Sequence, residues 1–223
     1  MTISKNPEKI QEMFNIIAER YDRNNTLISL GTHNFIKYMS VKNLEIKSGA
    51  KILDSCTGTG DIANLIKIFN PDTEVTGVDF SKNMLDIAKR KFPSVKFIHA
   101  DCTNLPFEDE TFDIVTMSFG LRNIEDYGSA LRETYRVLKS GGQFLHLDFG
   151  EKNFFSKVFN IIIPPLIKVF YGNFLPYTYL LESKNEFPPP DDLVKLFESY
   201  GFKKKFVRNF LFGIISVQIM KKP

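Results

Sequence analysis

The stretch Lys51–Asp61, KILDSCTGTGD, together with Thr76–Leu85, TGVDFSKNML, decides the fold of this chain. Each stretch has an apolar run that ends in an acid, and a loop with two glycines follows the first run. A strand, a tight glycine turn and a helix beginning near Asp61 form the first half of a nucleotide-binding βαβ unit. Asp79, at the tip of the next strand, is then expected to accept hydrogen bonds from both hydroxyls of a ribose.

The glycine spacing leaves the cofactor open, because Gly58, Gly60 and Ala63 also satisfy the loose dinucleotide-binding pattern. A pyrophosphate binds at a helix N-terminus that has no carboxylate beside it. S-Adenosylmethionine instead brings a sulfonium and an ammonium. Asp54 and Asp61 flank the loop, and their charge suits this cation and repels a diphosphate at short range. The segment therefore favours S-adenosylmethionine.

Length and composition limit the remaining possibilities. The 223 residues suffice for one α/β domain with a substantial core but hardly for two. A formal net charge of +3 does not argue for nucleic acid as a partner. Cys56 and Cys102 have no Cys or His at metal-ligand spacing, so we expect a reducing compartment, no disulfide framework and no metal site. The N-terminus has no apolar signal segment, which favours a cytoplasmic location.

Apolar periodicity between residues 49 and 150 predicts a parallel, doubly wound sheet that forms the cofactor-binding core, because strand-like runs alternate with helical patterns. Two adjacent glycines, Gly141 and Gly142, are expected to turn the chain into the fifth strand. The expected strands are Lys51–Asp54, Glu74–Asp79, Val95–His99, Phe112–Met117 and Gln143–Phe149, and the expected helices between them are Asp61–Phe69, Lys82–Lys91 and Glu125–Leu138.

The N-terminal segment, residues 1–48, is predicted to be a helical lid. It contains a helical pattern at Pro7–Asp22, a polar loop with a glycine, and a second helical stretch at Phe35–Val41. Residues 151–190 are predicted to form an apolar cap. Phe154–Leu175 is rich in Phe, Ile, Leu and Val, but an adjacent proline pair and a lysine argue against a membrane span. We expect a broken helical cap, and transient contact with a bilayer is left open.

The C-terminal segment, residues 191–223, is predicted to add a helix at Asp191–Tyr200 and two strands at Lys203–Asn209 and Ile214–Met220. An antiparallel hairpin at the edge of a parallel sheet is typical of the class I methyltransferase fold. The sequence therefore predicts a single Rossmann-like α/β domain over residues 1–223, with a seven-stranded, mostly parallel sheet.

Ligands of open α/β sheets bind beyond the carboxyl ends of the strands. The first loop is expected to hold the methionine part of the cofactor, Asp79 the ribose, Met84 and the Asp101–Cys102 pair the adenine, and Ser118 the region beneath the sulfonium. Helix capping by Asp79 or a turn at Asp101 remains an alternative for either acid taken alone. The predicted cofactor-binding residues are Asp54, Gly58, Thr59, Gly60, Asp79, Met84, Asp101, Cys102 and Ser118.

Several segments resemble the ubiquinone/menaquinone biosynthesis C-methyltransferase family, and the similarity covers nearly the whole chain. The signature segments are ERYDRNNTLISLGTH at 19–33, LPFEDETFDIVTMSFGLRNIED at 105–126 and RVLKSGGQF at 136–144, and YLLES at 179–183 and RNFLFGI at 208–214 resemble C-terminal segments of that family. The resemblance implies methyl transfer from S-adenosylmethionine to the ring carbon of a polyprenylated demethyl-quinol.

The chain departs from the family pattern at three places. Asp148-Phe149-Gly150 stands where EFS is usual, and Ile36 stands where tryptophan is common. Around Leu211 and Phe212 the usual threonine and glycine are replaced, on the expected substrate side. The first two replacements are mild, but the last one leaves the exact quinone open. The sequence also does not choose between the menaquinone and ubiquinone pathways.

The chemistry needs a group that favours the phenolate of the quinol, because an aromatic carbon attacks a methyl sulfonium much faster from that anion. Arg122, beside Asn123, is the candidate, since a guanidinium lowers the pKa of a neighbouring phenol. The structural alternative is that Arg122 pairs with a carboxylate, such as Glu125, as part of the scaffold.

The polar loop of the predicted lid contains Tyr21, Asp22, Asn25 and His33, which we expect to fold over the cofactor. His33 could accept the phenolic proton or be structural, and Arg20 with Tyr21 is expected to close the lid. The predicted catalytic residues are Arg122, Asn123, His33 and Tyr21.

Two other functions stay open at this point. The chain could methylate another hydrophobic phenol or a sterol-like molecule. It could also be a non-catalytic subunit that binds S-adenosylmethionine in a quinone-synthesis complex. The sequence leaves the length of the prenyl tail, peripheral contact with the inner face of a membrane and assembly into a homo-oligomer undecided.

Overall fold

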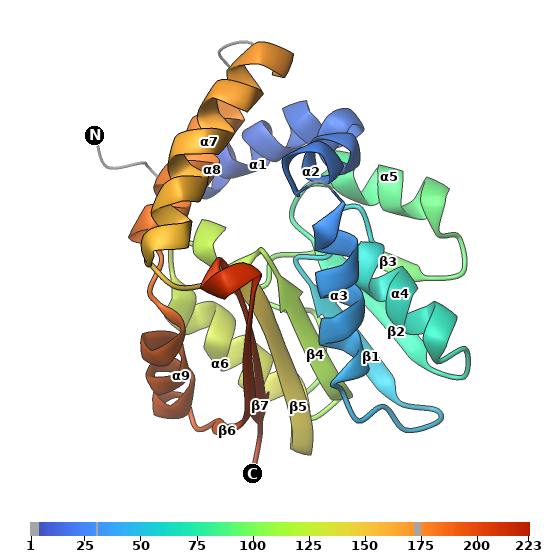
Figure 1. Cartoon of the computed structure of the whole chain (residues 1–223). Coiled ribbons are helices and arrows are strands. Elements are labelled where there is room, and N and C mark those ends of the chain that lie inside the picture. Colours follow the sequence, from blue (N-terminus) through green and yellow to red (C-terminus); the bar gives the residue numbers. More distant parts are fainter. Residues whose placement is uncertain (1–4, 30, 172–174) are drawn as a thin grey trace.

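A seven-stranded sheet forms the centre of the computed structural model, which describes residues 5–29, 31–171 and 175–223 (Figure 1). The strand order is β3-β2-β1-β4-β5-β7-β6. All neighbours pair in parallel except β7, which is antiparallel to both β5 and β6. The strands are β1 (Lys51–Ser55), β2 (Glu74–Asp79), β3 (Lys96–His99), β4 (Phe112–Ser118), β5 (Leu138–Phe149), β6 (Lys203–Phe210) and β7 (Ile215–Lys221). The predicted fold class is confirmed.

The sheet is buried on both faces, which explains the nearly continuous apolar runs of its strands. Ile52 and Leu53 are neighbours on β1 and have no exposed surface, yet they belong to two separate cores. Ile52 packs with residues of α3 (Thr32–Lys42) and α4 (Asp61–Phe69), and Leu53 with residues of α6 (Tyr127–Val137) and α9 (Pro190–Ser199). Helices therefore cover the sheet on both sides, and α5 (Lys82–Lys91) packs against β3.

The strand order reverses at β1, which pairs with β2 on one side and β4 on the other. The chain leaves β1 toward one face of the sheet and β4 toward the other, so a crevice opens beyond the carboxyl ends of these two strands. This position is the one that the sequence predicted for the cofactor.

The predicted polar loop after Asp22 is wrong, because the chain there is helical. The segments are α1 (Pro7–Ile17), a 3₁₀ turn at Ala18–Arg20, α2 (Tyr21–Ser29) and α3, which begins after Gly31 at a φ of 78°. Asparagine and threonine give α2 a weak helix propensity. The helix is stabilised by tertiary contacts of Asp22, which binds the core through Thr59 and Lys91.

The predicted break of the cap helix at the proline pair is also wrong. Pro164 and Pro165 lie inside α7 (Phe154–Tyr171), and α8 (Leu175–Glu186) follows it. The prolines remove two backbone donors, but contacts with α8 hold the helix, since Lys184 donates to Asn160 and Asn160 donates to Asn185. Figure 1 shows this helix pair standing beside α1 and α2 above the sheet.

The fifth strand begins five residues earlier than predicted, at Leu138 instead of Gln143. The expected glycine turn lies within the paired region, where Gly141 has a φ of 78° and its N–H donates to the carbonyl of Lys222. A register shift between Phe112 and Ile114 accommodates this irregularity. The other strands and core helices agree with the predicted bounds to within one or two residues.

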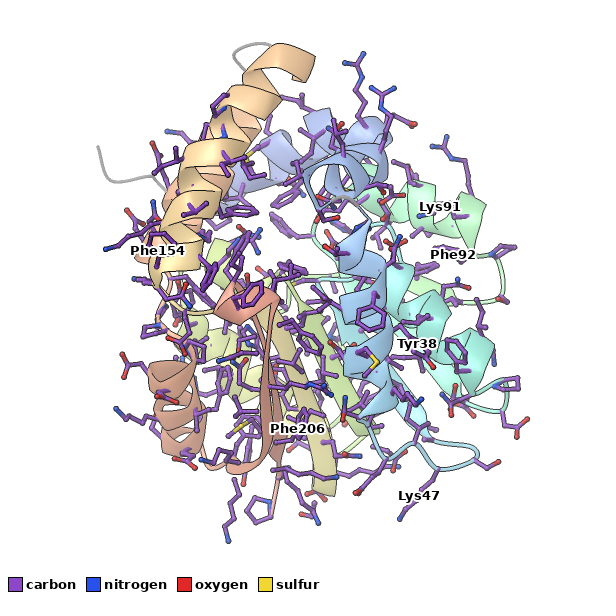
Figure 2. All side chains as sticks on the ribbon, viewed as in Figure 1. Tyr38, Lys47, Lys91, Phe92, Phe154 and Phe206 are labelled. Carbon is purple, nitrogen blue, oxygen red and sulfur yellow. The ribbon has the colours of Figure 1, made fainter. Side chains whose placement is uncertain are left out.

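Exposed apolar side chains gather on α7 and on the 3₁₀ turn at Leu211–Gly213, which connects β6 and β7. Phe154 lies at the start of α7 and is directed outward (Figure 2). The rings of Phe155 and Phe212 stack with centroids 4.5 Å apart. We call this surface the apolar ridge; it consists of Phe154, Phe155, Ile161, Ile162, Leu211 and Phe212. Within the described ranges, no helix has both the length and the apolar character to cross a membrane.

Candidate active site

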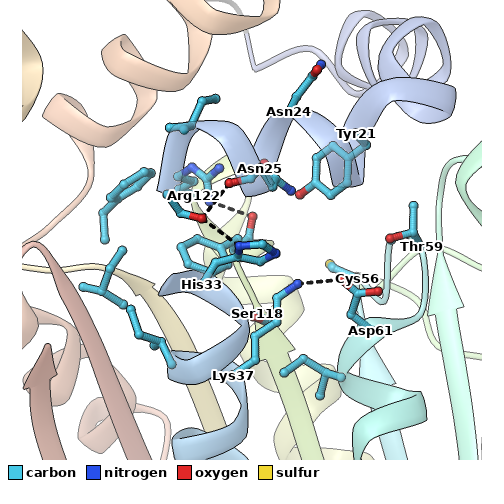
Figure 3. Close-up of a pocket in the computed structure, with 18 of the residues that line it drawn as sticks. Tyr21, Asn24, Asn25, His33, Lys37, Cys56, Thr59, Asp61, Ser118 and Arg122 are labelled. Atoms are coloured by element: carbon cyan, nitrogen blue, oxygen red, sulfur yellow. Dashed lines mark hydrogen bonds and ion pairs between the residues drawn. The ribbon is translucent and has the colours of Figure 1, made fainter. Parts of the chain in front are cut away.

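Two adjoining cavities lie beyond the carboxyl ends of the strands. The strand-end cavity is lined by Asp79, Met84 and Asp101, and the cap cavity, drawn in Figure 3, by Arg122 and His33. The two cavities share several lining residues, so they form one continuous site from the ends of β2 and β3 to the cap. The shared residues are Phe14, Tyr21, Cys56, Gly58, Ser118, Phe119 and Asn123.

The glycine loop is shaped by residues with positive φ angles. Gly58 has a φ of 56°, borders both cavities and leaves open space where a side chain would stand. Gly60, also predicted to bind the cofactor, is not among the described residues that line either cavity. A Cβ there would lie 2.8 Å from the ring of Phe97. The structure gives this glycine a packing reason, since it lets α4 begin close to β3, and its contact with the cofactor stays a prediction.

Asp79 connects the first loop to the second. One carboxylate oxygen accepts a hydrogen bond from the N–H of Gly58 at 2.8 Å, and the other accepts from the N–H of Ser81 at 2.8 Å. The N-cap of α5 is Ser81, whose hydroxyl accepts from the N–H of Met84. Asp79 is therefore not the helix cap that the alternative required. Burial raises the pKa of its carboxyl group.

The other residues predicted for the adenine also line the strand-end cavity. Met84 and Cys102 are buried. Asp101 accepts a hydrogen bond from the N–H of Thr103, which makes a local turn as well. A hydrogen bond with Cys102, together with burial, raises the pKa of the Cys56 thiol. A raised pKa keeps the thiol protonated, so Cys56 packs at the site and is not a nucleophile.

The two acids beside the glycine loop are less free than their sequence positions suggest. Asp54 is 1% exposed and accepts from the hydroxyls of Thr57 and Thr116 at 2.6 Å each. Burial raises the pKa of Asp54 to about 6. Asp61 forms ion pairs with Lys37 at 2.8 Å and Lys91 at 3.0 Å. Burial opposes ionisation of Asp61, but the two lysines outweigh it and lower its pKa to about 2.

The ion pairs of Asp61 continue into the helical lid. Asp22 on α2 accepts from the hydroxyl of Thr59 at 2.6 Å and from Lys91 at 2.6 Å. Thr59 lines the cap cavity but already uses its hydroxyl in this contact. Tyr21 borders both cavities, whereas Arg20 is exposed and lines neither of them. The prediction that Arg20 closes the lid is therefore wrong; Asp22 joins the lid to the core instead.

Arg122 is 5% exposed and its guanidinium is held from two sides. Its Nη1 donates to Asp148 at 2.9 Å and to the carbonyl of Phe119 at 2.7 Å. The guanidinium also lies 5.7 Å from the ring centroid of Phe119 and 5.2 Å from that of Phe149. The structural alternative is confirmed in kind, because Arg122 does pair with a carboxylate, but the partner is Asp148 and not Glu125. Sequence reasoning missed Asp148 as a partner, and only its position at the end of an apolar strand could have indicated it.

The remaining predicted catalytic residues meet at the cap cavity. Asn123 donates through Nδ2 to the carbonyl of Phe119. His33 lies in the first turn of α3, and its Nδ1 is 2.7 Å from the hydroxyl of Ser29. Burial and the charge of Lys37 lower the pKa of His33, against the opposing effect of two nearby carboxylates. The ring is therefore neutral near pH 7 and can accept a proton.

Five residues that line the cap cavity each have a buried side-chain polar atom with no hydrogen-bond partner among the described residues. Such atoms are rare in folded proteins and invite a ligand or water. Two of the residues that carry these atoms, Asn24 and Tyr179, were not predicted from the sequence as site residues, although Tyr179 belongs to the YLLES segment. In the described part of the chain, the unpartnered atoms of cavity-lining residues are Asn24 Oδ1, Ser118 Oγ, Arg122 Nε, Asn123 Oδ1 and Tyr179 OH.

The sheet order and the crevice past β1 define this protein as a class I S-adenosylmethionine-dependent methyltransferase. The model of the ubiE/COQ5 methyltransferase family matches residues 1–222, and the chain belongs to this family. A demethylmenaquinone methyltransferase of Staphylococcus aureus is 38% identical over 224 residues, which cover 96% of this chain and 93% of that protein. The family and the fold confirm that the chain is an enzyme and that its cofactor is S-adenosylmethionine.

Solved structures agree on the fold. A possible histamine N-methyltransferase from Thermotoga maritima has a TM-score of 0.73 at 22% identity, covering 96% of this chain and 100% of that chain. A phosphoethanolamine N-methyltransferase of Haemonchus contortus, solved with S-adenosylmethionine, has a TM-score of 0.68 at 17% identity, covering 94% of this chain and 60% of that one. At these identities the likeness concerns the fold and not the substrate.

Proposed function

We propose that this enzyme transfers a methyl group from S-adenosylmethionine to a ring carbon of a polyprenylated demethyl-quinol, with demethylmenaquinol as the first candidate. The observation that carries the proposal is the buried guanidinium of Arg122, a residue that lines the cap cavity and whose Nε has no partner among the described residues. The name of the Staphylococcus aureus relative supports a naphthoquinol. A phenolate is the anion that such a quinol would present to Arg122.

The strand-end cavity suits the cofactor. Asp79 would bind the ribose, Met84 and Asp101 the adenine, and Ser118, whose hydroxyl is unpartnered where the cavities meet, would lie near the sulfonium. The bound cofactor supplies an electrophilic methyl group. The chain has to exclude water, align the ring carbon with this methyl group and stabilise the phenolate.

Arg122 would stabilise the phenolate and Asn123 would orient the ring through its free Oδ1. His33 is neutral and lines the same cavity, so it would take the phenolic proton directly or through water. Tyr21 would close the junction between the two cavities. The contacts of Asp22 with Thr59 and Lys91 would hold residues 1–48 as a lid in the closed position.

The helices of residues 151–190 would cover the prenyl tail, since Phe159 on α7 and Phe149 at the end of β5 line the cap cavity. The apolar ridge borders this region, because Leu211 also lines the cavity. We propose that the ridge touches a bilayer from which the quinol enters. Two facts support this: Phe212 is 76% exposed, and it stacks on Phe155 of α7.

Turnover with labelled S-adenosylmethionine tests the proposal. Demethylmenaquinol should be methylated at carbon, and a benzoquinol precursor of ubiquinone and an unrelated hydrophobic phenol serve as competing substrates. Transfer to the phenol alone would assign the enzyme to another hydrophobic substrate, and binding of the cofactor without transfer to any of them would indicate a non-catalytic subunit.

A further inference from the structure

Tyr179 lies on α8 and contributes a hydroxyl group to the cap cavity. The residue is 8% exposed, and its hydroxyl has no hydrogen-bond partner in the described part of the chain. It lines the cavity together with Arg122, Ser118 and Asn123. A buried hydroxyl that lacks a partner destabilises the folded protein, so a ligand oxygen that accepts a hydrogen bond from it would remove this cost.

The surroundings of Tyr179 keep its hydroxyl a donor. Helix α8 packs against the 3₁₀ turn that carries Arg122. Burial raises the pKa of Tyr179 to about 12. The charge of Arg122 opposes this rise, and Asp148, Tyr127 and Glu186 add to it. The phenol of Tyr179 therefore keeps its proton over the working range of the enzyme.

A neutral donor beside a guanidinium is suited to an anionic oxygen. The carbonyl of Phe119 and the carboxylate of Asp148 already accept from Arg122 Nη1, but the Tyr179 hydroxyl has no acceptor among the described residues. Hydrogen bonds to the charged form of a group lower its pKa, and their effect adds to that of a nearby cation.

We propose that the Tyr179 hydroxyl donates a hydrogen bond to the same ring oxygen that Arg122 stabilises, so that two donors hold the phenolate of the bound quinol. This inference rests on the proposed function and adds a catalytic residue from the cap. The cap would then serve the reaction itself, because α8 delivers a donor to the reacting ring only when it is packed over the Arg122 turn.

The test is the pH dependence of kcat/KM for Tyr179→Phe, which keeps the ring and removes the donor. We expect a loss of about tenfold to 100-fold and a shift of the acid limb to higher pH by about one unit. The Kd for S-adenosylmethionine should stay within about twofold of the wild-type value, because Tyr179 does not line the strand-end cavity. Tyr135→Phe is the matched control, since Tyr135 packs on Phe202 away from both cavities.

A second substrate separates a donor from a packing residue. A quinol analogue with an electron-withdrawing ring substituent forms its phenolate more easily, so the loss for Tyr179→Phe should shrink with it. Tyr179→Gln keeps a neutral hydrogen-bond donor. The acid limb of its kcat/KM profile should therefore lie between the limbs of the wild type and Tyr179→Phe.

Equal losses with both substrates and an unmoved acid limb would overturn the inference and leave the proposed function intact. A quinol has two ring oxygens, and the inference concerns the one that Arg122 stabilises. If the loss caused by Tyr179→Phe disappeared only with a substrate that lacks the other ring oxygen, the inference would also be overturned. A wild-type enzyme that methylates no quinol would overturn both the proposed function and this inference.

Discussion

Arg122 and Asp148 form a buried ion pair, with Nη1 of the arginine 2.9 Å from Oδ1 of the aspartate. The pair joins the turn after β4 to the end of β5, which are parallel neighbours in the sheet. Arg122 Nε and Asp148 Oδ2 have no partner among the described residues. The ion pair thus fixes the guanidinium at the cap cavity without using all of its donors.

Arg122→Lys should reduce catalysis and leave the affinity for S-adenosylmethionine near the wild-type value. A lysine keeps the charge but lacks the planar fork, and loss of one anion-stabilising donor costs about 10²–10³-fold in kcat. Single-turnover methylation measures the effect. Arg208→Lys is the control, because Arg208 is exposed on β6. A parallel loss of cofactor binding would reassign Arg122 to the scaffold.

Asp79→Ala should weaken the binding of S-adenosylmethionine at least about tenfold, because charged hydrogen bonds to two ribose hydroxyls contribute roughly 2–3 kcal/mol. Isothermal titration calorimetry gives the Kd. Asp113→Ala is the matched control: Asp113 also accepts from a backbone N–H, that of Lys51, but at the opposite end of the sheet. An unchanged Kd in folded Asp79→Ala protein would restrict this acid to joining the two loops.

The raised pKa of Asp54 should make the free energy of unfolding fall as the pH rises. Its pKa of about 6 in the folded state lies above the ordinary value of 3.8, so the unfolded chain loses the proton first. The stabilisation is complete below pH 3.8 and is lost as the pH rises through 6, by about 3 kcal/mol. Denaturant unfolding of the wild type and Asp54→Asn should show this difference between pH 4 and 7. Parallel pH profiles of the two proteins would contradict the elevated pKa.

Charge on the apolar ridge should weaken contact with lipid. Ile162 is 51% exposed, so Ile162→Asp and Phe212→Asp should reduce co-sedimentation with anionic liposomes and leave turnover of a detergent-dispersed quinol unchanged. Ile68→Asp on α4 is the control, because Ile68 is 62% exposed and lies away from the ridge. Wild-type protein that stays in the supernatant would contradict contact with lipid. A concentration-dependent dimer that Phe212→Asp dissociates would assign the ridge to an interface between copies of the chain.

The length of the prenyl tail should affect kcat/KM, because binding energy from the tail orients the ring. Each pair of buried methylenes should contribute roughly tenfold, at about 0.8 kcal/mol per methylene. Phe159→Ala, which opens the wall of the cap cavity, should reduce this preference, while a change at Ile162 acts from the outer surface. Ile167 would be a second position in the cap for a charged substitution, but its side chain lies outside the described residues. Equal kcat/KM values for short and long tails would mean that the cap does not bind the tail and serves as buried core or as an oligomer interface.

The site was predictable as far as it follows the ends of strands. Asp79, Asp101 and Ser118 stand at or just past the ends of apolar runs, and Met84 lies in the first turn of the helix that follows β2. The parallel sheet brings those strand ends together by itself. Of the polar set expected in the lid loop, Tyr21, Asn25 and His33 line the cap cavity, whereas Asp22 contacts Thr59 and Lys91 of the core. The expected loop conformation was wrong, because helix propensity is a weak local signal that contacts across the fold override.

The sequence by itself determined the order of strands and helices, the crevice at β1 and the class of cofactor, because periodicity, glycines and terminal acids act over a few residues. Only the tertiary structure decided which charges are neutralised and which polar atoms stay free. Arg122 meets Asp148 through the pairing of Ser118 with Leu147, Lys37 and Lys91 neutralise Asp61, and α8 brings Tyr179 to the cavity. Such contacts depend on the register and packing of segments far apart in the chain, which no local pattern encodes.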